Sequence, residues 1–100
     1  MAYLDVHKNP GLGGGYLVDI QAPLLAYLKT RVVIPLLPRD EAPLPARGLN
    51  PIFELGGLDY VLTTQFISAV TTKELGSPTA SLLPYRDEII RAVDIILAGI

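Results

Sequence analysis

The chain has 100 residues, of which half are hydrophobic and 18% are charged, and its formal net charge is −2. A chain of this length is expected to form one domain, 1–100, and to bury only about two-thirds of the surface that its unfolded form exposes. It therefore carries more apolar surface than a monomer hides easily, and we expect a homodimer or a complex. No run of Lys or Arg occurs, which disfavours direct nucleic-acid binding.

The sequence contains no Cys, which excludes disulfides and thiolate metal sites and suits a reducing cytoplasm. The first residues lack the basic segment followed by an apolar one that is typical of a signal peptide, and no uncharged apolar run approaches the roughly 20 residues of a membrane span. The spacing of His, Asp and Glu resembles no metal site. We therefore expect a cytoplasmic protein that uses neither a metal nor a cofactor.

The N-terminal residues predict a β-hairpin. Residues 2–7 and 16–21 flank a segment, 8–15, that holds four glycines and a proline. In the second strand, side chains at 16, 18 and 20 alternate with those at 17, 19 and 21, as in a strand with one buried face. The glycines match neither a dinucleotide-binding fingerprint nor a phosphate loop, because Tyr16 replaces the third glycine and no Lys-Ser or Lys-Thr pair follows.

A short apolar segment and a third strand follow the hairpin. Pro23 ends the second strand, and residues 24–28 are apolar with no polar neighbour to shield them, so we expect them to be exposed. Residues 31–36 predict a strand in which Pro35 should lie at an edge, a bulge or the strand end, because it cannot donate to a ladder. Residues 37–51 contain four prolines and predict a surface loop.

The clearest local pattern is a second hairpin, in which Gly56 and Gly57 form a two-residue turn between strands at 52–55 and 58–64. Residues 65–70 fit a strand or a turn of helix. Residues 71–75 fit a further edge strand that the following Gly-Ser-Pro ends.

The last element is expected to be a helix. Pro84 suits its first turn, and Asp87 and Glu88 complement its dipole. Only Arg91 and Asp94 interrupt the apolar residues that follow Glu88, so the apolar stripe is wider than one core contact needs. The helix either docks entirely on the sheet or also binds a partner. We therefore predict a mostly β fold of about five antiparallel strands with one C-terminal helix.

Catalytic chemistry has little support in the sequence. His7, the one histidine, lies two residues from Asp5, but no nucleophile motif accompanies them. We expect His7 on the surface or in a dimer contact. Five arginines are expected to form surface pairs with neighbouring acids, and they are Arg31, Arg39, Arg47, Arg86 and Arg91.

Four segments together resemble CcdB, the family of gyrase-poisoning toxins of bacterial toxin–antitoxin modules. They are residues 17–21, residues 32–36, the Thr-Thr pair at 63–64, and residues 86–100 with their Ala-Gly-Ile end. The resemblance implies a homodimer with an SH3-like barrel core, related in fold to the MazF ribonuclease toxins. It also implies that the two C-terminal helices lie near the dimer axis.

In the family, the C-terminal end and the apolar connection wedge between the arms of the gyrase A subunit and trap cleaved DNA, which blocks replication and transcription. Carried over by position, the gyrase-binding residues are Leu24, Leu25, Asp94, Leu97, Ala98, Gly99 and Ile100. Asp94 and Leu97 stand where the family usually has Asn and Phe. Ala98 stands where it has a Trp that stacks on a gyrase arginine. Gly99 suits a left-handed helix cap.

The resemblance implies a CcdA-like antitoxin, small, acidic and partly disordered, through which the complex would bind DNA, and a role in plasmid maintenance. Antitoxin contacts are predicted at Lys8, Asn9 and Leu12. Three alternatives stay open. Leu24 and Leu25 could fill the dimer core; the chain could be a MazF-like endoribonuclease that uses Arg31 with a Thr or Ser between protomers; or it could be an inactive relative that keeps only antitoxin binding.

Overall fold

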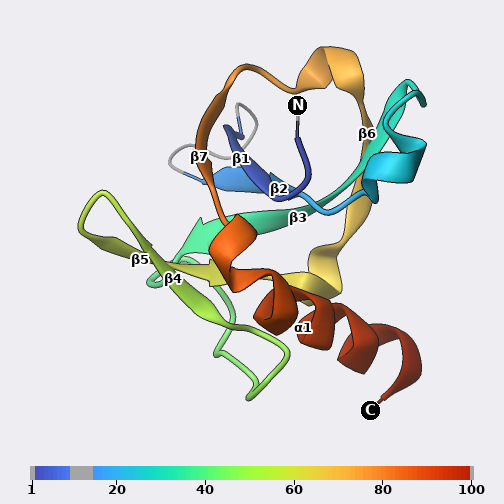
Figure 1. Cartoon of the computed structure of the whole chain (residues 1–100). Helices are drawn as coiled ribbons and strands as arrows, with labels where there is room; N and C mark the ends of the chain where they lie inside the picture. Colours follow the sequence, from blue (N-terminus) through green and yellow to red (C-terminus); the bar gives the residue numbers. More distant parts are fainter. Residues whose placement is uncertain (1, 10–14, 100) are drawn as a thin grey trace.

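The computed structural model describes residues 2–9 and 15–99, and within them seven antiparallel strands curl into a half-barrel with one α-helix across its end (Figure 1). The strands are β1 Asp5–Lys8, β2 Tyr16–Asp19, β3 Thr30–Pro38, β4 Ile52–Leu55, β5 Leu58–Leu62, β6 Ser68–Thr71 and β7 Pro78–Ser81. The helices are the 3-10 turns η1 Pro23–Leu25, η2 Thr64–Phe66, η3 Thr72–Glu74 and η4 Leu83–Tyr85, and the α-helix α1 Arg86–Ala98. The strand order is β4-β5-β3-β2-β1-β7, and β6 pairs with β3. This confirms the predicted class, an SH3-like barrel with a C-terminal helix.

Both predicted hairpins are confirmed. β1 pairs with β2 in a register that sets Val6 opposite Val18. β4 pairs with β5 across Gly56 and Gly57, whose φ angles of 59° and 84° are those of the tight turn that glycine favours. Figure 1 shows this second hairpin projecting away from the rest of the sheet.

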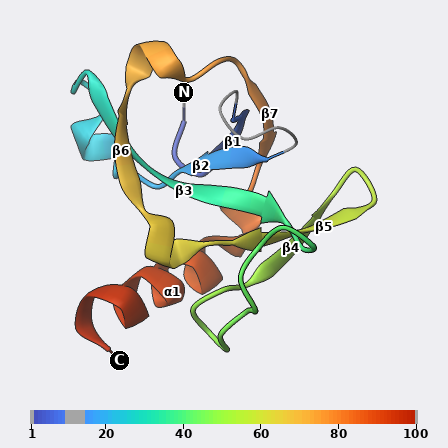
Figure 2. The same cartoon turned by 180° about the vertical axis from the view of Figure 1, so that it is seen from behind.

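The sheet buries side chains on both of its faces, so the prediction of one buried face for the second strand is wrong. Val18 packs in the main core, whereas Leu17 packs with Val33 and Leu75 on the other face. Leu75 follows η3, where the chain passes from β6 over to β7 (Figure 2). The buried residues of the main core are Leu4, Val6, Val18, Ile34, Leu36, Phe53, Tyr60, Leu62, Leu82 and Ile89.

Tyr60 of this core contacts Tyr16, which is half-buried and packs against the core. The rings of Tyr16 and Tyr60 meet edge to face with their centroids 5.2 Å apart. Burial raises the pKa of the Tyr60 phenol above its ordinary 10.0, and the neighbouring Tyr16 raises it further. Tyr60 therefore stays neutral at physiological pH.

Pro35 lies inside a central strand, and the prediction that it marks an edge, a bulge or a strand end is wrong. β3 continues past it, pairing with β6 as far as Val33 and with β5 from Leu36. Between these partners, the Pro35 carbonyl accepts the backbone N–H of Thr63 at 2.9 Å and its hydroxyl at 2.8 Å. The N–H and carbonyl of a strand residue point to the same side. The side of Pro35 that lacks an N–H thus faces the point where β6 ends and β5 begins as the partner of β3.

The expected edge strand at 71–75 is also wrong. The backbone N–H of Thr71 donates to the Glu74 carboxylate at 2.7 Å, and this capping box starts the 3-10 turn η3 instead. Pro78, which was expected to follow the end of a strand, begins β7, and β7 pairs with β1. The structure has more than the expected five or so strands because β6 and β7 both form.

His7 is fully buried, which contradicts its predicted place on the surface or in a dimer contact. Its Nδ1 lies 2.7 Å from the carbonyl oxygen of Gly76, and its Nε2 has no hydrogen-bond partner within the described part of the chain. The bond fastens β1 to the segment that leads into β7. His7 is therefore a packing residue rather than a surface base.

A buried ion pair joins β2 to β3. The Asp19 and Arg31 residues are 0% and 2% exposed, and Nη2 of Arg31 lies 2.7 Å from Oδ2 of Asp19. Nε of Arg31 donates to the same oxygen at 2.9 Å. The prediction of a surface pair is wrong for Arg31, because its partner is a strand neighbour 12 residues away inside the sheet. A charge at this depth is tolerated only when it is paired.

Replacing Arg31 should therefore lower the free energy of unfolding more than replacing an exposed arginine does. We expect Arg31→Ala to lower the free energy of unfolding by roughly 3–5 kcal/mol, because it leaves the Asp19 carboxylate buried without its partner. Arg39→Ala is the matched control: Arg39 also pairs with an Asp, but both side chains are exposed and 3.5 Å apart, and such pairs contribute below about 1 kcal/mol.

Urea denaturation of both variants at one protein concentration measures the difference. Equal losses of stability in the two variants would contradict the structural importance of the buried pair.

Candidate functional site

The first candidate surface is the apolar turn, residues 22–28, which contains η1 and connects β2 to β3. Leu24 and Tyr27 are 85% and 79% exposed, and Leu25 is 39% exposed. The turn is closed by backbone bonds, among them Ala26 N–H to the Pro23 carbonyl at 3.1 Å. The predicted exposure of this segment is confirmed, and in the isolated chain Leu24 does not belong to the core.

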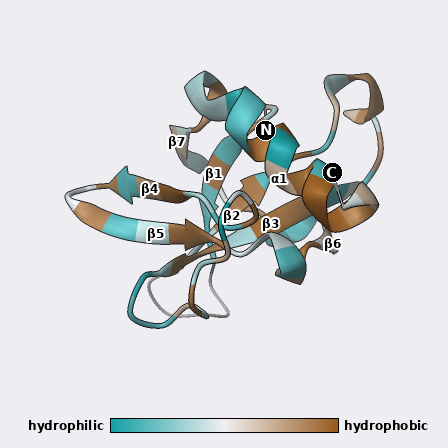
Figure 3. Ribbon diagram, turned by 90° about the horizontal axis from the view of Figure 1, so that it is seen from below, coloured by the Kyte–Doolittle hydropathy of each residue, from teal (hydrophilic) through white to brown (hydrophobic). Residues whose placement is uncertain are grey.

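The second candidate surface is the helix end, residues 94–99. α1 buries Ile89 and Ala92 against the sheet, but in its last turns Leu97 is 75% exposed. Figure 3 shows these turns as hydrophobic beside the C-terminus. Gly99 has φ 72° and donates to the Ile95 carbonyl at 2.9 Å, so the predicted left-handed cap is confirmed. Pro84 lies in η4, one turn before α1 begins, rather than in the helix itself.

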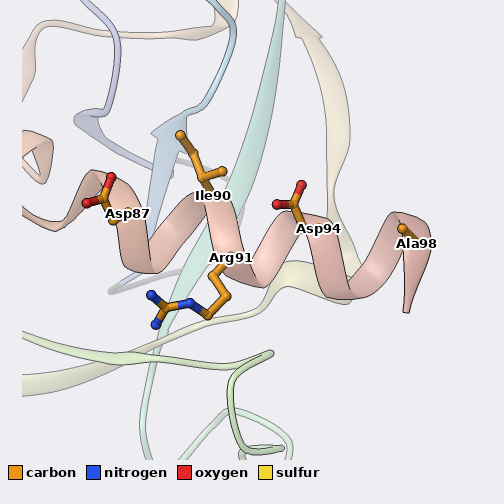
Figure 4. Close-up of a pocket in the computed structure, with 5 residues that line it drawn as sticks. All are labelled: Asp87, Ile90, Arg91, Asp94 and Ala98. Atoms are coloured by element: carbon orange, nitrogen blue, oxygen red, sulfur yellow. The ribbon is translucent and has the colours of Figure 1, made fainter. Parts of the chain in front are cut away.

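A shallow hollow runs along the exposed side of α1. It is lined by Asp87, Ile90, Arg91, Asp94 and Ala98, so two residues of the predicted gyrase-binding set share it (Figure 4). These residues recur along α1 at three- and four-residue spacing, which puts them on one stripe of the helix. Within residues 2–9 and 15–99, Arg91 forms no ion pair with Asp87 or Asp94, contrary to expectation. The stripe therefore offers an unpaired guanidinium and two carboxylates to solvent.

The two surfaces do not meet within one chain. In Figures 1 and 2, η1 lies beside one end of β6 and the helix end lies beyond the other. α1 instead packs against η2 and η4. Leu24 and Leu25 are thus separated from Leu97, Ala98 and Gly99.

Other predicted site residues are placed as follows. Lys8 is exposed and Asn9 is half-buried, and the Asn9 N–H donates to the Gly15 carbonyl at 3.1 Å across the base of the first hairpin. Leu12 and Ile100 lie outside the described residues. Arg31, which the ribonuclease hypothesis would use, is buried in its ion pair with Asp19 and is not available to a phosphate.

The structure adds residues that the sequence analysis missed. Phe66 in η2 is half-exposed, on the turn that packs against α1, and Ile96 is partly exposed on α1 itself. Tyr27 stands out in the apolar turn. Their signal was an aromatic or branched apolar residue within or beside an apolar segment, which is too common to single out a site.

No group of three His, Asp or Glu side chains that could hold a metal occurs within the described ranges 2–9 and 15–99. In the same ranges, no helix has both the length and the apolar character needed to cross a membrane.

Comparison with known families agrees with the resemblance noted from the sequence. The family model described as CcdB protein matches residues 3–99, nearly the whole chain. A search of curated proteins finds no match. The matched region includes all seven strands, the apolar turn and the helix end. The chain belongs to the CcdB family, whose members are toxins of toxin–antitoxin modules.

Proposed function

We propose that this protein is a toxin that binds the A subunit of DNA gyrase and traps its cleaved-DNA complex. The observation that carries the proposal is the family match over residues 3–99. Two exposed apolar surfaces at the positions that the family uses support it. The toxin acts by binding and performs no chemistry of its own.

The proposed gyrase contacts are the residues expected from the sequence. Leu24 and Leu25 supply the apolar turn, and Asp94, Leu97, Ala98, Gly99 and Ile100 supply the helix end. Leu24 and Leu97 each leave most of an apolar side chain in water, which costs free energy that burial in a partner recovers. Asp94 and the neighbouring Arg91 add charges that can pair with gyrase side chains and fix orientation.

We propose that the active form is a homodimer. The helix end of one chain lies apart from its own apolar turn, so a single chain presents two small surfaces. A two-fold axis near the helix ends brings two copies of that surface together. We expect the arms of the gyrase A subunit to contact this combined patch.

We also propose that a CcdA-like antitoxin neutralises the toxin. An acidic, partly disordered partner would order on binding and cover apolar surface that is otherwise exposed. Lys8, Asn9 and Leu12 remain the proposed additional contacts, at the first hairpin, and Lys8 provides an exposed positive charge there.

Charged substitutions on the two surfaces test the gyrase proposal. We expect Leu24→Asp and Leu97→Asp each to weaken binding of the gyrase A subunit by about tenfold or more, because central apolar contacts dominate interface energies. Both side chains project into solvent, so stability should change by under about 0.5 kcal/mol. Leu44→Asp is the matched control, since Leu44 is 94% exposed on the loop between β3 and β4.

Titration of immobilised gyrase A subunit with each purified variant measures the affinities, and urea denaturation checks the folds. Equal affinities for all three variants and the unsubstituted protein would place the contact elsewhere.

Restoring the family's aromatic residue should strengthen binding. Ala98 is exposed at the rim of the helix hollow, so a larger side chain has room to project outward. We expect Ala98→Trp to raise gyrase affinity by about tenfold or more through a new aromatic contact of roughly 2 kcal/mol. The same titration measures it, with Leu44→Trp as control. A gain of equal size in Leu44→Trp would mean that any exposed aromatic ring suffices.

A further inference from the structure

A cluster of buried polar side chains lies directly beneath the apolar turn. Gln21, only 5% exposed, follows β2, and its side chain bonds on one side to the apolar turn and on the other to β3. Its Nε2 donates to the Leu25 carbonyl at 2.8 Å, and its Oε1 accepts the Val32 backbone N–H at 3.1 Å. One side chain therefore joins the apolar turn to the central strand β3.

The buried ion pair completes this cluster. Oδ1 of Asp19 accepts the backbone N–H of Gln21 at 3.0 Å, while its other oxygen holds Arg31. Nη1 of Arg31 lies 3.5 Å from the Ala26 carbonyl oxygen. The carbonyls of Leu25 and Ala26 come at the end of η1, where a helical turn leaves acceptors free for side-chain donors. The Leu25 carbonyl also accepts the Leu28 backbone N–H at 3.1 Å. The cluster supplies a side-chain donor to both carbonyls.

The turn has no fully buried apolar anchor. η1 contains no buried residue, and Leu25 and Leu28 are the apolar side chains that it shields in part, at 39% and 37% exposed. A 3-10 turn of three residues held only by local backbone bonds is weakly stable. Leu24 and Tyr27 project from this turn, and the polar cluster adds buried side-chain bonds to the local backbone bonds that hold it.

We propose that Gln21 is a positioning residue, seated by Asp19 and Arg31, that holds the apolar turn in its binding conformation before a partner arrives. An ordered turn loses less conformational entropy on binding than a flexible one, so the cluster raises affinity without contacting the partner. The identity of the partner as gyrase rests on the function proposed above. The role of Gln21 in ordering the turn does not depend on which partner binds.

Gln21→Ala tests this role, and Asn50→Ala is its matched control. Asn50 is likewise 5% exposed and carries the same carboxamide. It accepts the backbone N–H of Ala46 at 3.0 Å and donates to the Leu62 carbonyl at 3.0 Å, and to Oε1 of Gln65 at 2.7 Å. Both side chains thus tie a loop to a strand, but only Gln21 touches the apolar turn.

Native-state hydrogen exchange gives a readout that a general loss of stability does not imitate. In the turn, the amides of Leu25, Ala26 and Leu28 are bonded to carbonyls within it; in the control loop, the amides of Leu49 and Asn50 are bonded to Ala46. After normalisation to the stability of each variant in urea, Gln21→Ala should speed exchange by about tenfold in the turn only. Asn50→Ala should do so in its own loop only.

The second readout is affinity for the gyrase A subunit. We expect Gln21→Ala to bind about tenfold more weakly and Asn50→Ala to bind within about twofold of the unsubstituted protein. Unchanged exchange in the turn of Gln21→Ala, or equal acceleration there in Asn50→Ala, would overturn the role of Gln21. So would unchanged gyrase affinity despite a loosened turn. If the unsubstituted protein fails to bind gyrase, the proposed function falls while the exchange comparison still decides the role of Gln21.

Discussion

The buried ion pair between Asp19 and Arg31 fixes how β2 and β3 align. Two charges buried at the junction of β2 and β3 are tolerated only in one register, in which each satisfies the other. That register also fixes where the connection between the strands leaves and rejoins the sheet. The apolar turn is this connection, so its position follows from the ion pair, with Gln21 linking the two.

The fold separates stability from binding. The main core and the smaller cluster around Leu17 close both faces of the curled sheet. The apolar turn and the helix end contribute little to either, and their exposed leucines work against the stability of an isolated chain. A family of toxins that act by binding needs such surfaces. The half-barrel presents them apart, beside opposite ends of β6 (Figures 1 and 2).

Local patterns in the sequence predicted local structure well. The Gly56-Gly57 turn and the left-handed cap at Gly99 depend only on backbone conformations that glycine adopts. The errors concern contacts between distant segments. His7 is buried and its ring lies within hydrogen-bond distance of the Gly76 carbonyl, 69 residues away, and Pro35 fits a central strand because two partner strands meet opposite it. Local patterns of this kind report pairing between segments close in sequence, so the separation of the two exposed apolar surfaces was also beyond prediction.

The most direct test is whether the protein traps gyrase on DNA. Purified protein is incubated with gyrase, ATP and supercoiled plasmid, and detergent and protease then reveal cleaved DNA. We expect linear plasmid to accumulate with protein concentration and to disappear when Leu97→Asp replaces the unsubstituted chain. Toxicity in cells without linear plasmid in this assay would contradict gyrase as the target, and cleavage of RNA by the same preparation would identify a different one.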